Sequence, residues 1–193
     1  MLYIITGPTL SGKTTLVDNL VTSTGIKKIV TYTNRDIRKN ERNHIDYNFV
    51  TTKELDNDDL ICKRVFYTKN RVEPYIYALD KNDLLSKNDL ILIIDPLGVR
   101  EIKDYLGKDS VTTVYIDASE SLIRERARKR GDSIDEVNRR LSVDRDLFVS
   151  APYFADIVLD ADNDDMLQYM YNELKGRVHN EIDRRDQTRQ ERN

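Results

Sequence analysis

The sequence predicts an α/β fold of three layers, in which helices cover both faces of a parallel sheet. Runs rich in β-branched and aromatic residues alternate with segments of helical periodicity along the chain. Residues 90–94 are apolar at every position, which is typical of a strand buried on both faces of a parallel sheet. The 193 residues are enough for one such domain with insertions.

The first predicted strand, residues 2–6, leads directly into a glycine-rich loop. Residues 7–14 match the complete pattern G-x-x-x-x-G-K-[ST], and apolar residues at 16, 17, 20 and 21 predict a helix immediately afterwards. A strand, a tight turn and a helix N-terminus in this order aim several backbone N–H groups at one polyphosphate. This P-loop predicts a nucleoside triphosphate site. Its residues are Gly7, Pro8, Thr9, Leu10, Ser11, Gly12, Lys13, Thr14 and Thr15.

Two side chains of the P-loop have predicted roles of their own. Lys13 is expected to neutralise the β- and γ-phosphates, and the Thr14 hydroxyl is expected to hold Mg²⁺. The sequence therefore predicts Mg²⁺ as cofactor.

The segment between the first helix and residue 88 predicts a small, mostly β insertion. Its predicted elements are a strand at 28–32, a polar functional loop at 33–43, a strand at 46–50, a short helix at 51–55, strands at 61–68 and 72–78, and a helix at 80–86.

The remaining chain predicts further βα steps and a helical lid. The predicted elements are a helix at 97–106, a strand at 111–116, an arginine-rich helix at 119–129, a helix that begins at Ser133 with Glu136 completing a capping box, a strand at 155–159 and a helix at 163–175. That last helix is expected to bury Met166, Leu167, Met170, Tyr171 and Leu174, and the charged residues 179–193 are expected to form a flexible tail.

These elements define a predicted domain organisation. The core comprises 1–32, 88–118 and 150–178, the nucleoside monophosphate (NMP)-binding insertion is 33–87, and 119–149 hold the lid and the helix that follows it.

Composition excludes several classes of protein. The net charge of −3 argues against a nucleic-acid partner, whose binding domain is usually basic. No apolar run reaches the roughly 18 residues that a membrane span needs, and no secretory signal is expected. The single cysteine, Cys62, excludes an intramolecular disulfide and predicts a buried thiol. We expect a cytoplasmic monomer or homodimer without a membrane partner.

The polar loop holds a candidate for a second phosphate site. Arg35 and Arg38 lie three residues apart, and Tyr47 lies on the next predicted strand. Guanidinium groups match phosphate geometry, and a phenol adds a neutral donor, so the three can converge on one dianionic phosphate. Taken alone, the same residues also fit a solvated charged loop.

Together with the P-loop, this segment resembles guanylate kinase, whose pattern is T-T-R-x-x-R-x-x-E-x-x-x-x-D-Y-x-F-V. The matching residues are Arg35, Arg38, Glu41, Asp46, Tyr47, Phe49 and Val50, all without a gap. The resemblance covers nearly the whole chain. It continues in Asp95-Pro96-Leu97-Gly98-Val99, in Arg130-Gly131, in residues 137–141 and in residues 156–160.

The resemblance implies an ATP-dependent nucleoside monophosphate kinase that phosphorylates (d)GMP or another (d)NMP. It implies that the acceptor site consists of Thr31, Arg35, Arg38, Glu41, Tyr47 and Tyr77. It also implies a catalytic set of Lys13, Arg35, Asp95, Arg130 and Arg140, in which the last two belong to the lid. These roles suit phosphoryl transfer, which needs positioning and neutralised charge.

The sequence departs from the family where the guanine base is recognised. The family has a glutamate on the strand after D-Y-x-F-V, whereas residues 63–68 contain no acid and Glu73 is the nearest one. The family's Tyr-Gly-[Ser/Thr] motif is matched only by Tyr77-Ala78-Leu79. Its T-T-R motif appears as Thr33-Asn34-Arg35, and Asp160 stands where the family commonly has an asparagine. The acceptor base therefore stays open.

Two alternatives remain. A related ribosyl-phosphate kinase is consistent with residues 33–35 and 43–45, and a non-catalytic guanylate-kinase-like module would bind a protein ligand. The intact P-loop favours an enzyme over the module.

Overall fold

A computed structural model describes residues 1–39, 41–67, 71–164, 168 and 171–177. The chain divides into two compact units, Met1–Lys28 with Asn88–Asn193 and Ile29–Lys87. Each unit is built around its own sheet.

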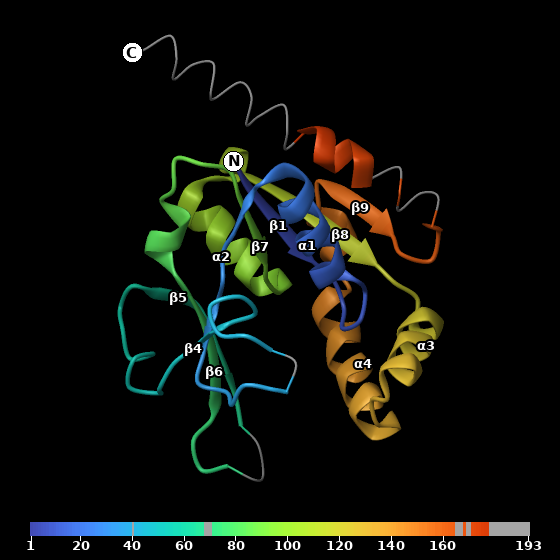
Figure 1. Ribbon diagram of the computed structural model, residues 1–193, viewed down its shortest axis with the longest axis horizontal. Coiled ribbons are helices and arrows are strands. Elements are labelled where there is room, and N and C mark those ends of the chain that lie inside the picture. The colour runs from blue at the N-terminus through green and yellow to red at the C-terminus, as the bar shows by residue number, and fades with distance from the viewer. Residues whose placement is uncertain (40, 68–70, 165–167, 169–170, 178–193) are drawn as a thin grey trace. The chain divides into compact units, whose positions relative to one another are not determined.

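The first unit contains a five-stranded sheet in the order β2-β7-β1-β8-β9, and every strand pair in it is parallel (Figure 1). The strands are β1 (Leu2–Thr6), β2 (Lys27–Lys28), β7 (Leu90–Ile93), β8 (Val111–Asp117) and β9 (Ile157–Asp160). The sequence prediction of a parallel core sheet is confirmed. Because the strands are parallel, their carboxyl ends meet at one edge, and the P-loop follows β1 there.

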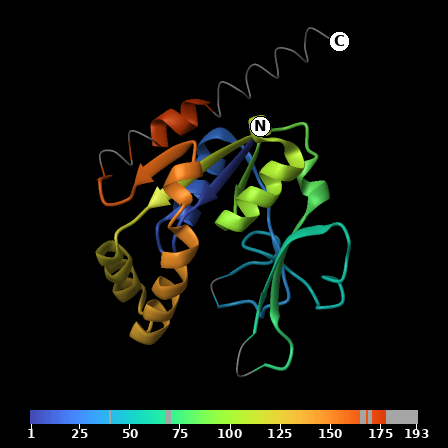
Figure 2. The same cartoon turned by 180° about the vertical axis from the view of Figure 1, so that it is seen from behind.

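Helices cover both faces of this sheet, which explains why its strands are apolar throughout. Tyr3 and Ile5 pack against Leu16, Val17 and Leu20 of α1 (Lys13–Thr24). The alternate residues Leu2 and Ile4 are equally buried and face the other way. Figures 1 and 2 show α1 on one face and α2 (Pro96–Leu106) on the other. The short helices η2 (Lys108–Ser110) and α5 (Ala151–Phe154) lead into β8 and β9.

The arginine-rich segment forms a helical hairpin of α3 (Glu120–Arg130) and α4 (Ile134–Phe148). Its small core consists of Ile123, Ala127, Val137 and Leu141, with Leu10 of the P-loop packed against it. The Ser133 hydroxyl accepts from the Glu136 amide and so caps α4, as predicted. Leu10 therefore ties this hairpin to the P-loop.

The second unit contains a four-stranded sheet in the order β4-β3-β6-β5. Its strands are β3 (Tyr32–Thr33), β4 (Asn48–Phe49), β5 (Leu60–Phe66) and β6 (Tyr75–Asp80), followed by the 3₁₀ helix η1 (Lys81–Leu84). Leu55, Leu60 and Ala78 form the core under one face of the sheet. Cys62 is buried, as its neighbours predicted.

The predicted strand at 28–32 is wrong as a single element. Lys28 ends β2 in the first sheet, whereas Tyr32 begins β3 in the second. Asn48 explains the break, because its amide donates to the carbonyl of Thr31 and its side chain donates to the carbonyl of Val30. The chain therefore leaves one sheet and enters the other within this run.

Other predicted elements of the insertion differ in kind or extent. Residues 51–55 form a turn closed by i→i+3 bonds rather than a helix. The predicted strand at 72–78 begins only at Tyr75, because Pro74 has no N–H to donate to a ladder. The predicted helix at 80–86 is the single 3₁₀ turn of η1.

The predicted strand at 155–159 begins only at Ile157. The predicted final helix is described at 164, 168 and 171–177, where Leu174 is buried and Tyr171 packs on the core. Met166, Leu167, Met170 and the predicted tail at 179–193 lie outside the described residues. Within the described part of the chain, no helix has the length and apolarity that crossing a bilayer requires.

Candidate active site

The P-loop bends tightly at the carboxyl end of β1. Gly7 has φ of 154°, and a Cβ there would lie 2.6 Å from the carbonyl oxygen of Ile116 on the neighbouring strand β8. Only glycine can occupy this position without moving the sheet. The loop borders a cleft of about 780 Å³ in the first unit. Its lining residues include 10–16, Asn19, Arg126, Arg130 and Tyr171.

Lys13 lies inside the P-loop. Its Nζ donates to the carbonyl oxygens of Gly7 at 2.8 Å and Pro8 at 2.6 Å. Burial disfavours the charged amine and lowers the pKa of Lys13 to about 8, although the negative charge of Asp144 acts in the opposite direction. The ammonium is therefore held where the phosphates of a nucleotide would meet the loop.

Thr14 and Thr15 lie exposed in the first turn of α1, next to Lys13. Among the described residues, no group of three or more His, Cys, Asp or Glu side chains could hold a metal ion. A site with a single hydroxyl ligand fits Mg²⁺, which usually takes its other ligands from substrate phosphates and water. Thr14 is thus suited to the predicted metal role.

Arg126 is a site residue that sequence reasoning missed. Its Nη1 donates to the carbonyl oxygens of Leu10 at 2.9 Å and Ser11 at 2.8 Å. Leu10 has φ of 58°, and these two bonds help to hold that uncommon backbone conformation. The sequence did contain a signal for this residue. Arg126 lies three residues after the buried Ile123 and four residues before Arg130, and residues three or four apart share a helix face.

Asp144 of α4 is a second missed residue. Its Oδ2 accepts from the backbone amide of Thr9 at 2.6 Å, so a carboxylate already occupies one N–H group of the P-loop. Burial raises the pKa of Asp144. The sequence signal was a charged residue at helical spacing from Val137 and Leu141, in an otherwise apolar stripe. Asp144 both stabilises the Lys13 ammonium and opposes an incoming phosphate.

Replacing Asp144 by asparagine is expected to tighten Mg-ATP binding at pH 6.5 by about fivefold, since roughly 1 kcal/mol of repulsion is removed. In the unchanged protein, affinity should fall as the pH rises through the Lys13 pKa of about 8, because the neutral amine cannot offset phosphate charge. In the Asp144→Asn protein this alkaline loss of affinity should begin at a lower pH, because Asp144 no longer raises the pKa of Lys13. Calorimetric titration from pH 6 to 9 measures both effects.

The exposed Asp146 provides the control for this experiment. Asp146→Asn should bind Mg-ATP like the unchanged protein at every pH. If the Asp144→Asn protein bound Mg-ATP with the affinity of the unchanged protein and lost that affinity at the same pH, the role assigned to Asp144 would be contradicted.

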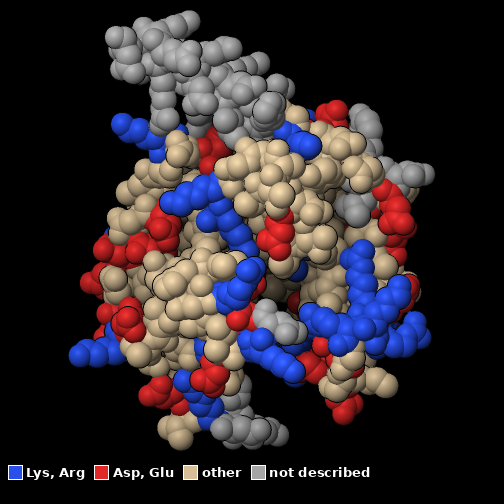
Figure 3. Space-filling view, in the orientation of Figure 1, with Lys and Arg blue, Asp and Glu red and all other residues tan. Residues whose placement is uncertain are grey.

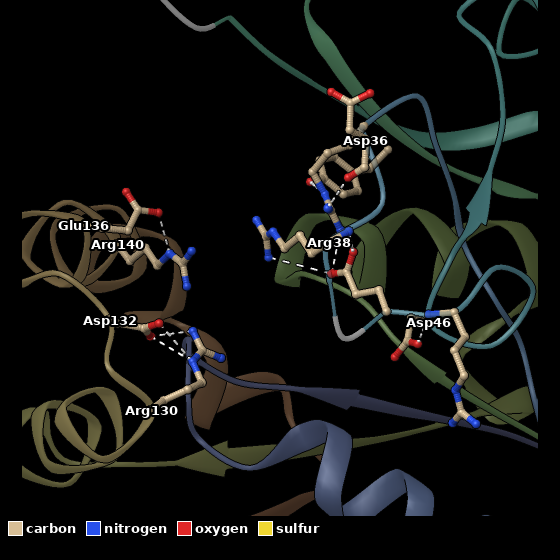
Figure 4. A network of polar contacts seen from close by, with 11 residues as sticks. Asp36, Arg38, Asp46, Arg130, Asp132, Glu136 and Arg140 are labelled. Atoms are coloured by element: carbon tan, nitrogen blue, oxygen red, sulfur yellow. Dashed lines mark hydrogen bonds and ion pairs between the residues drawn. The ribbon is translucent and has the colours of Figure 1, made fainter.

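The two predicted lid arginines are each paired with an acid inside the hairpin (Figure 4). Arg130 Nε lies 3.0 Å from Asp132, and Arg140 Nε donates to Glu136 at 2.7 Å. Hydrogen bonds from Arg139 and Arg140 lower the pKa of Glu136 to about 2. Basic side chains gather over α3 and α4 (Figure 3), and Arg130 and Arg140 are among those that pair with acids of the same hairpin.

Asp95 follows β7 at the carboxyl edge of the sheet, as predicted. Its Oδ1 accepts from the Gly98 amide at 2.8 Å, so the side chain also caps α2.

The second unit holds the predicted acceptor residues, with Arg35 at their centre. Arg35 is buried, and its Nη2 donates to Oε1 and Oε2 of Glu41 at 2.8 and 2.9 Å. Its Nε donates to the hydroxyl of Tyr77 at 3.1 Å, and its Nη1 donates to the Asp36 carbonyl. Arg35 thus organises Glu41 and Tyr77 within one network.

Arg38 lies on the outside of this network. Its side chain is 61% exposed, and Nη1 is 3.8 Å from Glu41 Oε1. Its backbone amide donates to Glu41 Oε2 at 2.9 Å, and the loop is braced further on by the bond from the Arg42 amide to Asp46. Figure 4 labels Arg38 between Asp36 and Asp46. Arg38 is therefore the predicted acceptor arginine whose guanidinium is open to a ligand.

An aromatic wall of Phe49, Tyr47, Tyr77 and Phe66 lies beside Arg35. Successive rings meet edge to face, with centroids 5.8, 5.7 and 5.7 Å apart. The Arg35 guanidinium lies 5.4 Å from the centroid of the Tyr47 ring. Thr31 precedes β3 in the same unit, and its carbonyl accepts from the Asn48 amide. The wall offers a surface on which a planar base can stack.

Two residues connected with the departures from the family pattern, Asn34 and the nearby acid Glu73, form hydrogen bonds with other residues of the second unit. Asn34 Nδ2 donates to Thr52 Oγ1 and to the Pro74 carbonyl, and its Oδ1 accepts from the Ile76 amide. Glu73 accepts from Thr52 at 2.6 Å. Asn34 thus fixes the start of β6, and Glu73 is bound to the same threonine.

The parallel sheet, the P-loop and its cleft define the class of this protein: it is a P-loop nucleotide-binding protein of the α/β type. The sequence model of guanylate kinase matches residues 1–180. The chain therefore belongs to the guanylate kinase family, and it is a nucleoside monophosphate kinase. Neither the ribosyl-phosphate kinase nor the non-catalytic module that binds a protein ligand is favoured.

Curated relatives and a solved structure agree with this assignment. The guanylate kinase of Neisseria meningitidis serogroup B is 31% identical over 171 residues, covering 86% of this chain and 80% of that protein. The guanylate kinase of Nitrosospira multiformis is 28% identical over 177 residues, with 86% and 81% covered. The crystal structure of guanylate kinase from Anaplasma phagocytophilum shares the fold, with a TM-score of 0.64 at 20% identity over 94% of this chain and 86% of that one.

Proposed function

We propose that this protein transfers the γ-phosphoryl group of ATP to GMP or dGMP, giving ADP and the nucleoside diphosphate. The observation that supports the proposal is that a chain of the guanylate kinase family has a complete P-loop and, in its second unit, the exposed guanidinium of Arg38. The relatives named above are guanylate kinases, which supports guanine as the acceptor base.

The donor half of the reaction is assigned to the first unit. Backbone N–H groups of the P-loop and Lys13 bind the triphosphate, while Arg126 holds the loop by its carbonyl groups. Thr14 would hold Mg²⁺, which supplies charge neutralisation at the β- and γ-phosphates when it is bound. Arg130 and Arg140 are assigned to the transferring phosphoryl group, where they would offset the spreading negative charge.

The acceptor half is assigned to the second unit. Arg38 and the phenol of Tyr47 bind the acceptor monophosphate, and Arg35 holds Glu41 and Tyr77 in place around it. The aromatic wall stacks the base. Phosphoryl transfer involves no covalent relay, so positioning of the two phosphates and neutralisation of their charge account for the catalysis.

A monophosphate panel tests this function. Purified protein with Mg-ATP is offered GMP, dGMP, AMP, dAMP, CMP, UMP and dTMP, together with a ribosyl bisphosphate, and ADP is followed by a coupled assay. GMP or dGMP should stimulate ADP formation most strongly. Stimulation by a ribosyl bisphosphate but by no nucleotide, or by no acceptor at all, would overturn the proposal.

A further inference from the structure

A β-bulge on β5 determines which side chain faces the aromatic wall. Leu60 pairs with Asp80 and Ile61 with Leu79, but the next pair is Arg64 with Tyr77. Cys62 has φ of 54°, and Cys62 and Lys63 together oppose the single residue Ala78. An uninterrupted ladder would have paired Lys63 with Tyr77, so the bulge brings Arg64 to this position instead.

Arg64 consequently lies in a cross-strand row on the face that carries the acceptor residues. The row runs from Arg64 on β5 to Tyr77 on β6, then to Thr33 on β3 and Phe49 on β4. Directly paired residues direct their side chains to the same face of a sheet. The opposite face holds Ala78 and Leu60 in the core of the unit, which leaves the row facing away from that core.

Ring contacts confirm the face on which Arg64 lies. Phe66 is two residues beyond Arg64 on the same strand, so both side chains share one face. The Phe66 ring lies 5.7 Å from the Tyr77 ring, and Tyr77 accepts from Arg35. Arg64 is half-buried, and its Nη1 donates to the carbonyl of Lys63 at 3.0 Å. A guanidinium thus stands at the edge of the surface on which a base would stack.

We propose that Arg64 determines the specificity of the acceptor site by donating to the O6 and N7 atoms of guanine. This inference rests on the proposed function and names how its base is read. The chemistry is that of an arginine fork facing two adjacent acceptors, the commonest specific contact between proteins and guanine in nucleic acids. Both carboxylate oxygens of Glu41 accept from Arg35, and Glu73 Oε2 accepts from Thr52.

Adenine is disfavoured by the same contact, because it presents an amino group where guanine presents O6. The 2-amino group of guanine has no part in it. IMP should therefore serve as an acceptor about as well as GMP, whereas 7-deaza-GMP should be a poor one, because it lacks the N7 acceptor.

Steady-state kinetics of the full chain with GMP, IMP and 7-deaza-GMP test the proposal. The unchanged protein should show a KM for 7-deaza-GMP at least about fivefold above that for GMP, the scale of one hydrogen-bond donor left unsatisfied. Arg64→Met should raise the KM for GMP by about tenfold or more, with little change in kcat, and should abolish discrimination between the two nucleotides. Lys63→Met is the matched control, because Lys63 is exposed and lies outside the row.

Each outcome decides the proposal. Equal KM values for GMP and 7-deaza-GMP in the unchanged protein would overturn it without reference to any variant. Discrimination that survives in a folded Arg64→Met protein would also overturn it, and both results would leave the kinase function intact. No activity with GMP, dGMP or IMP in the unchanged protein would overturn the proposed function and this inference together.

Discussion

Lys13→Met is expected to lower kcat by about 10²–10³-fold, the usual cost of removing one preorganised charge from a transition state. Methionine keeps most of the aliphatic stem but cannot offset the charge that develops on the transferring phosphoryl group. The fold should survive, because the change removes a charge that burial already disfavours. A coupled ADP assay with the preferred monophosphate measures the loss, and thermal unfolding checks the fold.

Lys27→Met is the control for this experiment, since Lys27 is an exposed lysine on β2 of the same unit. It should leave kcat unchanged. A folded Lys13→Met protein that keeps more than about a tenth of the activity would contradict the donor role of Lys13.

Arg35→Met is expected to destabilise the second unit by about 3 kcal/mol, because it strands the carboxylate of Glu41, whose side chain is only 16% exposed. Arg38→Met should cost less than about 0.5 kcal/mol, since the Arg38 side chain is 61% exposed. Both variants should raise the KM of the acceptor. Amide hydrogen exchange of residues 29–87 measures the stability of this unit separately from the other.

A double variant separates the contribution of Arg35 to the stability of the second unit from its contribution to acceptor binding. Arg35→Met combined with Glu41→Leu leaves no buried charge without its partner, since Arg38, the other basic partner of Glu41, is exposed. The double variant should therefore recover much of the lost stability while the acceptor KM stays high. Equal protection of residues 29–87 in the Arg35→Met and Arg38→Met proteins would show that Arg35 does not organise this unit.

Local patterns predicted the elements that form the donor site. The strand before Gly7 and the helix after Gly12 follow from a short apolar run and a helical repeat. The capping of α4 by Ser133 is equally local. Such features depend on residues within one turn or one strand of each other, which is why sequence reasoning finds them.

Contacts between distant residues were not predictable in this way. Asp144 reaches Thr9 across 135 positions of the chain, and Arg126 reaches Leu10 across 116. Residues 28–32 have strand propensity throughout, yet Asn48 draws part of the run into another sheet. In each case a partner elsewhere in the chain decided the outcome, and propensity carries no information about that partner.

The sequence by itself determined the α/β class, the P-loop and the family resemblance, because a short string of residues is sufficient to form each motif. The tertiary structure alone decided which side chains share a surface. One extra residue in β5, at the bulge of Cys62 and Lys63, reverses the face of every later residue in that strand. That shift places Arg64 instead of Lys63 beside Tyr77, and the register between two strands is a property of the pair that neither sequence specifies alone.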